Sequence, residues 1–289
     1  MENSAASEAG AVTLVACQQI APVVGDLSAN GDRAQAAIEL ALQSRAKVVV
    51  LPELCTSGYM FETQEEADSL AIGRDHPILA GWAEAACRSG AVVAGGFFER
   101  EEDGLIYNSA AVFPGAEPPA FYRKLHLWDR EKLWFTPGSE FPPVIDSAVG
   151  KLAVIVCYDL EFPELTRALA LAGVQLLLVP TNWPKLRRPE GERPAEVVIA
   201  MAAARANRMA IACCDRAGKE RGQEWEQGAT IVGPDGWVRA ESRAAGLLTA
   251  EVDLQAALEK RHTDLADAFG DRRPDFYVSL GVAPAGAPH

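Results

Sequence analysis

The sequence predicts an α/β fold that forms one domain with mixed sheets. Short apolar runs alternate along the chain with stretches of helical periodicity. The apolar runs are nearly continuous, which is typical of strands that are covered on both faces or packed in layers. No internal repeat, low-complexity block or Ser/Gly linker divides the 289 residues, of which 49% are hydrophobic. We therefore expect one core rather than two separate ones.

The first half of the chain is expected to alternate strands and helices before a hairpin. Residues 13–19 (TLVACQQ) predict a strand. Residues 32–45 place apolar side chains on one face at helical spacing, which predicts a helix. The other elements expected here are a strand at 47–53 that Pro52 closes, a helix at 78–89, and a hairpin of strands at 91–99 and 106–113.

The second half continues the alternation. A strand at 151–157 leads into a helix with Pro163 in its first turn and Gly173 just beyond its end. Residues 228–242 predict a hairpin across Pro234-Asp235-Gly236. The remaining elements are strands at 174–180, 209–215 and 246–253 and a helix from about 194 to 207.

The two ends of the chain differ from the rest. Residues 1–10 are small, acidic and polar, without the basic and apolar regions of a signal peptide, so we expect a disordered N-terminal tail. Residues 11–258 form the predicted domain, and residues 259–289 form a C-terminal extension that packs on the body or on a partner subunit. No run reaches the ~20 apolar residues of a membrane span, which favours a cytoplasmic protein.

Charge and cysteine usage exclude several function classes. A net charge of −13 argues against nucleic acid, which needs clustered Lys and Arg, and against an anionic membrane surface. The six cysteines lack C-x-x-C spacing and only four histidines are present, so neither a disulfide framework nor a metal site is expected. No Gly-rich phosphate loop is present either. We expect no metal and no cofactor.

The stretch LAVIVCYDLEFPE (152–164) runs from a buried strand directly into Cys157. A strand, a cysteine, a tight turn and a helix start are typical of a nucleophile elbow. The helix N-terminus is expected to help ionise the thiol, and its free N–H groups to hold an oxyanion. The alternative is an inert cysteine that packs at a strand end.

Two further polar residues follow predicted strands. Glu53 comes directly after VVVLP, and Lys124 lies in a segment rich in aromatic residues. Each could equally be a solvated residue of a loop or strand end. A catalytic cysteine usually needs a histidine base, but none is well placed, although His126 remains a candidate pocket residue. A glutamate would then be the base, which requires a site that excludes water and raises its pKa.

Three motifs together resemble the nitrilase, or carbon–nitrogen hydrolase, superfamily. They are VVVLPELCTSGY (48–59), YRKLHLWDREKLWFTPG (122–138) and VIVCYDLEFPELTRALALAG (154–173). Matches at ACQQIAPVVGDLSANGDRA (16–34), VPTNWP (179–184) and GATIVGPDGWV (228–238) support the resemblance, which spans about residues 12–255. It implies a four-layer αββα sandwich that forms at least a dimer.

The resemblance also implies a Glu–Lys–Cys triad. Glu53 matches the base and Cys157 the nucleophile, while Lys124 matches the lysine that stabilises the tetrahedral intermediate. Glu131 is the best match to a second glutamate that positions the substrate. The oxyanion would be held by Lys124 and the backbone N–H of Tyr158. Candidates for the substrate-binding wall are Tyr59, Trp128, Trp134, Asn182 and Trp183.

The details favour an amidase that releases ammonia from a small carboxamide through a thioester. Cys157-Tyr158-Asp159 stands where true nitrilases usually carry Cys-Trp-Glu. A nitrilase or an N-carbamoyl amidohydrolase, including an ω-amidase-like enzyme, is the alternative within the family, and an inactive scaffold is the alternative outside catalysis. Glu161 stands where relatives often have arginine, and Ala206 where they often have glutamate. The sequence assigns no role to Glu161.

Overall fold

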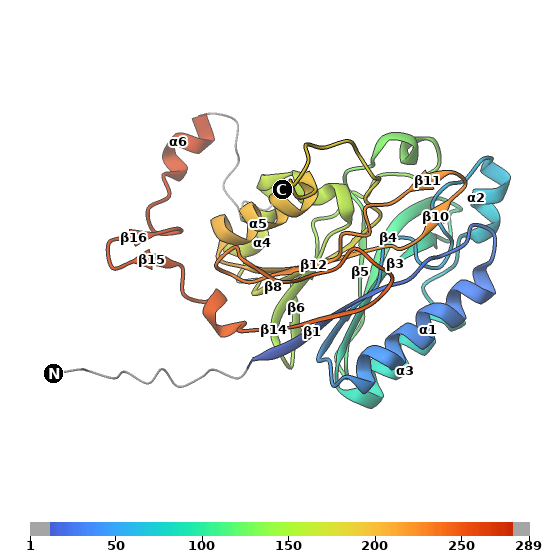
Figure 1. The fold of residues 1–289 in the computed structure, drawn as a ribbon, viewed down its shortest axis with the longest axis horizontal. Helices are drawn as coiled ribbons and strands as arrows, with labels where there is room; N and C mark the ends of the chain where they lie inside the picture. The colour runs from blue at the N-terminus through green and yellow to red at the C-terminus, as the bar shows by residue number, and fades with distance from the viewer. Residues whose placement is uncertain (1–11, 280–289) are drawn as a thin grey trace.

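The structure is a computed structural model that describes residues 12–279. The predicted tail at 1–10 therefore lies outside the described residues, as do residues 280–289. Two six-stranded sheets face each other, and helices cover their outer faces (Figure 1). This arrangement confirms the expected αββα sandwich, and both sheets are mixed, as predicted.

The first sheet has the strand order β14-β1-β2-β3-β4-β5. Its central strands β1, β2 and β3 are parallel, and the others pair antiparallel. The predicted hairpin between β3 and β4 is present. The strands are β14 (Gly246–Val252), β1 (Thr13–Gln19), β2 (Val48–Val50), β3 (Val92–Arg100), β4 (Ile106–Pro114) and β5 (Ala120–Arg123).

The second sheet has the order β13-β12-β9-β8-β7-β6 and repeats this plan. Here β7, β8 and β9 are parallel, while the hairpin of β12 and β13 pairs antiparallel at one edge. The strands are β13 (Val238–Glu241), β12 (Thr230–Val232), β9 (Ala210–Asp215), β8 (Leu176–Thr181), β7 (Gly150–Val154) and β6 (Ile145–Ser147).

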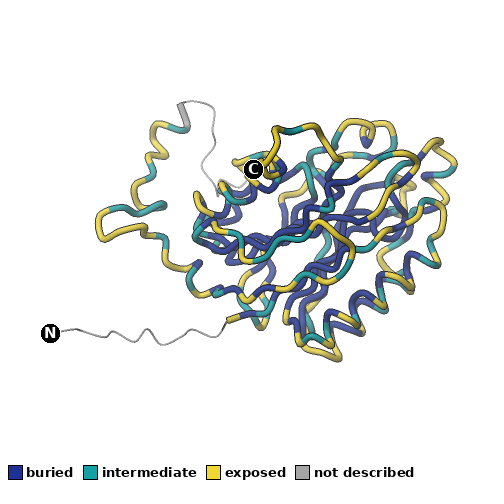
Figure 2. The backbone as a smooth tube through the Cα atoms, in the orientation of Figure 1, coloured by how far each residue is buried: buried dark blue, intermediate teal, exposed yellow. Residues whose placement is uncertain are grey.

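Alternation along the strands divides the core into layers. Val48 and Val50 of β2 belong to the cluster between the two sheets, whereas Val49 packs with Ile38 and Trp82 of the outer helices. Figure 2 shows the resulting buried strands inside helices with exposed outer faces. The covering helices are α1 (Leu27–Gln43) and α3 (Pro77–Ser89) on the first sheet, and α4 (Pro163–Leu171) and α5 (Ala195–Asn207) on the second.

The first helix begins earlier than the sequence predicted. Asp26 caps it by accepting a hydrogen bond from the Ala29 N–H at 3.2 Å, so α1 starts at Leu27 rather than near residue 32. The helical pattern of 32–45 is only the strongly apolar part of a longer helix. The Asp26 N-cap thus sets the N-terminal boundary of α1.

The C-terminal segment reaches away from the sandwich after residue 258 (Figure 1). It touches the second helical layer through Phe269, whose ring lies 5.2 Å from the Arg167 guanidinium carbon and 4.8 Å from Lys260 Nζ. A contact of this segment with a partner subunit stays a prediction.

The remaining elements are α2 (Gln64–Leu70), β10 (Lys219–Glu220), β11 (Gln223–Glu224), β15 (Arg261–Thr263), β16 (Ala266–Asp267), α6 (Pro274–Ser279) and 3₁₀ helices at Asp129–Leu133, Cys157–Glu161 and Gln255–Ala257.

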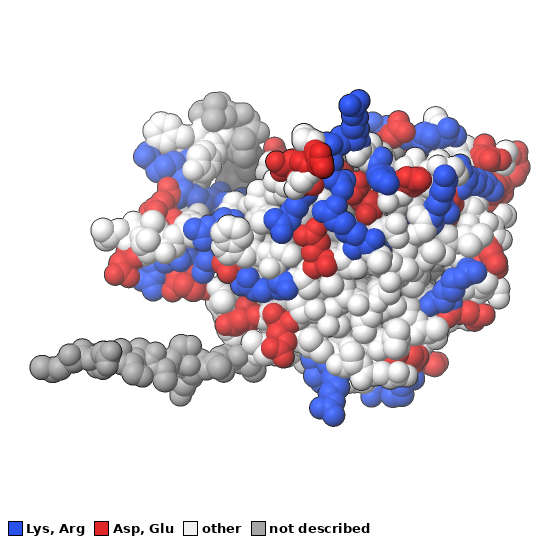
Figure 3. Space-filling model, viewed as in Figure 1, with Lys and Arg blue, Asp and Glu red and all other residues white. Residues whose placement is uncertain are grey.

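The surface and the helix lengths bear on possible partners. Acidic and basic side chains lie side by side on the face shown in Figure 3, which carries no continuous basic patch. Within residues 12–279, no helix is both long and apolar enough to cross a membrane.

Gly96 of β3 links the sheet to the loop after β2. A Cβ at this position would lie 2.5 Å from Glu53 Cα and 2.6 Å from Leu54 N, which are backbone atoms that cannot rotate away. We therefore expect Gly96→Ala to lower the free energy of unfolding by about 1–3 kcal/mol, because it overpacks this contact. Urea unfolding of the purified variant measures the change.

Gly81→Ala in α3 is the matched control. A Cβ there meets only the far end of the flexible Gln35 side chain, and alanine favours a helix by about 1 kcal/mol over glycine. Its stability should be equal to or higher than that of the parent. Equal unfolding free energies for the two variants would contradict the tight packing of Gly96 on the Glu53 loop.

Candidate active site

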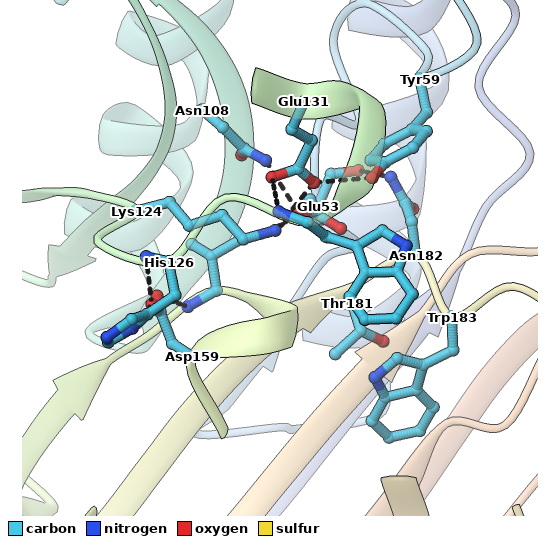
Figure 4. A network of polar contacts seen from close by, with 12 residues as sticks. Glu53, Tyr59, Asn108, Lys124, His126, Glu131, Asp159, Thr181, Asn182 and Trp183 are labelled. Atoms are coloured by element: carbon cyan, nitrogen blue, oxygen red, sulfur yellow. Dashed lines mark hydrogen bonds and ion pairs between the residues drawn. The ribbon is translucent and has the colours of Figure 1, made fainter. Parts of the chain in front are cut away.

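Three segments, one of them 71 residues from the lysine in the sequence, meet at a buried lysine beyond the carboxyl ends of the parallel strands (Figure 4). Lys124 follows β5 directly, and its Nζ donates to Glu53 Oε1 at 2.7 Å and to Glu131 Oε1 at 2.8 Å. Glu53 lies in the loop after β2, and Glu131 in the 3₁₀ helix Asp129–Leu133. All three side chains are almost completely shielded from solvent.

The Glu53 carboxylate is held through one oxygen. Its Oε1 accepts from Lys124 and from Asn108 Nδ2 at 2.7 Å, while Oε2 has no hydrogen-bond partner within the described chain. Burial raises the pKa of Glu53 to about 7, against the lowering effect of the Lys124 ammonium. The group can therefore change its protonation state near neutral pH.

Lys124 remains an ammonium ion in this environment. Burial alone would lower its pKa, but the carboxylates of Glu131 and Glu53 outweigh that effect and raise it. A fixed positive charge thus lies between two acids, where it can stabilise a developing negative charge.

Glu131 is oriented by residues of two other segments. Its Oε1 accepts from the Tyr59 hydroxyl at 2.7 Å, and its Oε2 accepts from the Trp128 N–H at 3.0 Å. Tyr59, expected only as part of the pocket wall, therefore also fixes the second carboxylate. Burial beside Glu131 raises the pKa of Tyr59, so its hydroxyl stays a donor.

Cys157 lies at the predicted turn, and a 3₁₀ helix that the sequence did not indicate separates it from the predicted helix α4. The residue has φ +48°, and it begins the 3₁₀ helix Cys157–Glu161, while α4 starts only at Pro163. The helix start at Pro163 is as predicted, and an effect of its N-terminus on the thiol stays a prediction. Burial, and then the negative charge of Glu53, raise the pKa of Cys157, whereas Lys124 lowers it. The resting thiol is protonated and needs a base.

Asp159 holds this strained turn in place. Its Oδ2 accepts from the Val156 N–H at 3.0 Å and from the Tyr122 hydroxyl at 2.8 Å. Its Oδ1 accepts from the His126 N–H at 3.0 Å, and His126 Nδ1 lies 2.7 Å from the same oxygen. His126, a candidate pocket residue from the sequence, instead stacks on Phe162 and supports Asp159.

Two adjoining cavities border Cys157 and Glu131. The inner pocket, about 20 Å³, is lined by Cys157, Tyr158, Trp183, Leu160 and Ile199 among others. The outer pocket, about 270 Å³, is lined by Glu131 and by the aromatic rings of Tyr59, Trp134, Phe135 and Trp225 among others. Trp128 and Asn182 line both cavities. The aromatic and amide residues that the sequence suggested all line at least one of these two cavities, whereas Glu53 and Lys124 belong to the buried contact network and His126 lines neither cavity.

Asp215, which the sequence did not single out, holds the loop after β8. Its buried carboxylate accepts from the backbone N–H groups of Trp183, Arg216 and Gly228, each at 2.9 Å. Asn182 of that loop donates through Nδ2 to the Glu53 carbonyl at 3.0 Å. The loop that walls both pockets is thus tied to β9 and to the Glu53 loop.

Sequence reasoning missed three residues that shape the site. Asn108 contacts Glu53, Asp215 fixes the Trp183 loop, and Trp225 adds a wall to the outer pocket. A polar pair inside the apolar strand 106–113 was the available signal for Asn108, and an acid at the end of ACCD was that for Asp215. Within residues 12–279 no group of three or more His, Cys, Asp or Glu side chains is arranged to hold a metal ion.

Comparison with known proteins gives a consistent result. The carbon–nitrogen hydrolase family matches residues 14–261. A nitrilase of Pyrococcus abyssi is 34% identical over 91% of this chain and 98% of its own length. An N-carbamoylputrescine amidase of Arabidopsis thaliana is 30% identical over 88% of this chain and 91% of its own length.

A solved structure matches at the level of the fold and of the sequence. The amidase from Nesterenkonia sp. AN1 superposes with a TM-score of 0.75 and 26% identity, over 94% of this chain and 97% of its own. In that structure, of a mutant, the acetamide moiety of fluoroacetamide is covalently added at the active-site cysteine.

The Asp159 contacts predict a strong effect of Asp159→Asn. Each carboxylate oxygen accepts from a backbone N–H, so either orientation of an asparagine amide would place its NH₂ group against a buried donor. We expect the free energy of unfolding to fall by about 1–3 kcal/mol for that unsatisfied donor. Turnover should fall about tenfold or more, because the Cys157 turn loses its anchor.

Tyr122→Phe is the matched control, since it removes a single donor and leaves the Val156 bond intact. The free energy of unfolding of Tyr122→Phe should fall by about 1 kcal/mol, and its turnover should fall less than that of Asp159→Asn. Thermal unfolding and steady-state rates measure both variants. Similar effects of the two substitutions would show that Asp159 does not support the turn as described.

Proposed function

The chain belongs to the carbon–nitrogen hydrolase family, and from that premise we propose that it is a cysteine-dependent amidase that converts small aliphatic carboxamides to the acid and ammonia. One observation carries the proposal. Lys124 and Asn108 occupy Glu53 Oε1, which leaves Oε2 free to accept a proton, and the charge of Glu53 acts on the Cys157 thiol. A base, a protonated nucleophile and a fixed cation are therefore assembled in one buried site.

The first half of the reaction forms a thioester. Glu53 takes the thiol proton while the Cys157 sulfur attacks the amide carbon. The ammonium of Lys124 and the backbone N–H of Tyr158, which lies in the first turn of a 3₁₀ helix, hold the oxyanion. Protonated Glu53 gives its proton to the departing NH₂ group, which leaves as ammonia. The relative in which acetamide is attached to the active-site cysteine supports this nucleophile.

The second half regenerates the enzyme. Glu53, now a carboxylate, takes a proton from water, and the resulting oxygen nucleophile attacks the thioester carbon. The same Lys124 and Tyr158 groups hold the second oxyanion. When it collapses, the sulfur leaves and recovers the proton from Glu53, and the carboxylic acid is released. Glu131 fixes Lys124 and borders the outer pocket, which suits a substrate-positioning role.

The inner pocket favours a small acyl group that is apolar next to the carbonyl carbon. It is narrow, and Trp128, Trp183, Leu160 and Ile199 contribute apolar walls next to Cys157. Such walls exclude water from the thioester. Trp134 and Tyr59 line the wider outer pocket, through which we infer that the substrate enters.

The acceptor groups favour an amide over a nitrile. Asn182 is buried and lines both cavities, and while its Nδ2 donates to the Glu53 carbonyl, its Oδ1 has no partner among residues 12–279. An amide offers N–H groups to such an acceptor, whereas a nitrile offers none. A carbamoyl group also has N–H groups, so an N-carbamoyl amidohydrolase is the second candidate, consistent with the similarity to an N-carbamoylputrescine amidase.

A matched substrate panel tests the proposed function. We expect ammonia release from butyramide with a kcat/KM at least about tenfold above that for butyronitrile, because the nitrile cannot satisfy the Asn182 acceptor. N-carbamoylpropylamine is the third compound. Cys157→Ala should abolish the activity on all three. Retention of full amidase activity in that variant, or a preference for the nitrile, would overturn the assignment.

The pH dependence tests Glu53 as the base. The base must be ionised, and burial raises its pKa to about 7, so kcat/KM should be full above that pH and fall about tenfold per unit below it. The profile of kcat/KM reports the free enzyme. An acidic limb near the ordinary glutamate value of about 4.3, or activity that rises only with thiol ionisation above about 8.5, would contradict this role.

A further inference from the structure

Two acidic side chains at the rim of the inner pocket have no part in the mechanism. Glu161 is the last residue of the 3₁₀ helix that begins at Cys157, and Glu196 lies in the first turn of α5. Both line the inner pocket together with the nucleophile. Glu161 is exposed and Glu196 half-buried, so the two carboxylates lie between the pocket and solvent.

Neither carboxylate is neutralised by the surrounding protein. Within the described chain, no hydrogen bond to another residue and no ion pair engages the side chain of Glu161 or of Glu196. Arg188 is the nearby cation, and it is bound by Glu226. Burial raises the pKa of Glu161, and burial together with the charges of Glu226 and Glu161 raises that of Glu196. Whenever these carboxylates are ionised, their negative charge is thus not paired with a cation of the described chain.

A second observation points to a ligand in the same place. Asn182 lines the inner pocket, and its buried Oδ1 lacks a partner among residues 12–279. It is an acceptor, as the two carboxylates are, and no Lys, Arg or His side chain contributes to the lining. These three acceptors would be matched by a ligand that brings donors or positive charge.

We propose that Glu161 and Glu196 select substrates whose acyl chain ends in a protonated amine. This inference rests on the proposed amidase function and names its substrate class. The ammonium group would lie between the two rim carboxylates while the carbonyl carbon reaches Cys157. A carboxylate at the same position would face like charges, so substrates with an anionic end would be disfavoured.

The thiol itself can report this charge preference without any turnover. We would compare the rates at which cationic 2-aminoethyl and anionic 2-sulfonatoethyl methanethiosulfonate modify Cys157. In each case the sulfur forms a disulfide with the reagent, loses its proton and expels methanesulfinate. Cys87, an exposed thiol on α3, is the internal reference, and peptide mass spectrometry separates the two sites.

We expect the cationic-to-anionic rate ratio at Cys157 to exceed that at Cys87 by about tenfold or more, as charge-lined clefts do for steered ligands. The ratio at Cys157 should fall several-fold in Glu161→Gln, in Glu196→Gln and most in the double variant. Because both reagents attack the same thiol, any change in its ionisation cancels in the ratio. Raising the salt concentration should lower the ratio in the unchanged protein, which provides a test that needs no variant.

Glu164→Gln is the matched control. Glu164 is exposed in the first turn of α4, three residues after Glu161, and it lines a neighbouring cavity rather than the inner pocket. Its variant should keep the ratio of the parent. Equal ratios at Cys157 and Cys87, or a ratio that the double variant and salt leave unchanged, would overturn the proposal.

The hydrolysis rates of three amides provide a second test of the proposal. 4-Aminobutyramide, pentanamide and glutaramate place an ammonium, a methyl and a carboxylate group at the same distance from the amide. We expect kcat/KM to decrease in that order, and the first-to-last ratio to fall several-fold in the double variant. If no amide released ammonia, the amidase function would fail, whereas the thiol ratios would still decide the charge preference.

Discussion

The buried Lys124 ammonium is the contact on which the rest of the site depends. An ammonium without solvent is stable only beside opposite charges, and Glu53 and Glu131 supply them at 2.7 and 2.8 Å. The three residues come from separate segments, so this network fixes the loop after β2, the end of β5 and the 3₁₀ helix at 129–133 relative to one another. Loss of one partner would leave an unpaired buried charge, which typically costs about 3–5 kcal/mol. Stability and catalytic geometry at this end of the sandwich therefore have the same origin.

Backbone strain is concentrated around these residues. Cys157 has a positive φ, as do Leu54, next to Glu53, and Asp129, two residues before Glu131. Such conformations typically cost about 1–3 kcal/mol each when the residue is not glycine, and they persist only where the surroundings hold them. Here the surroundings are carboxylates that accept backbone N–H groups: Asp159 from Val156 and Glu131 from Trp128. The strained backbone thus lies at Cys157 and next to Glu53, where the chain turns after β7 and β2.

Features that depend on local pattern could be predicted from the sequence. Strands and most helices could be found from apolar runs and helical spacing, and Glu53 and Cys157 because they end such runs, whereas Lys124 and the triad roles came from the resemblance to the superfamily. Contacts between distant segments could not: Asn108 meets Glu53 across 55 positions, and Asn182 meets it across 129. The 3₁₀ helix after Cys157 was also missed, because Pro163 marks a helix start but says nothing about the five residues before it. The position of Glu161 at the pocket rim could not be predicted either, because the same pocket is also lined by residues of α5, which is distant in the sequence.

One electrostatic arrangement acts on the thiol and on the ligands that reach it. With both acids ionised, Glu53, Glu131 and Lys124 together carry one negative charge in a site shielded from water, and this disfavours a second negative charge on the Cys157 sulfur. A protonated thiol beside a carboxylate is therefore the resting state, and the nucleophile forms only when a proton moves to Glu53. Glu161 and Glu196 extend negative charge to the pocket rim. An anionic ligand would be opposed both at the rim and at the thiol, whereas a neutral amide group with a cationic end would meet neither obstacle.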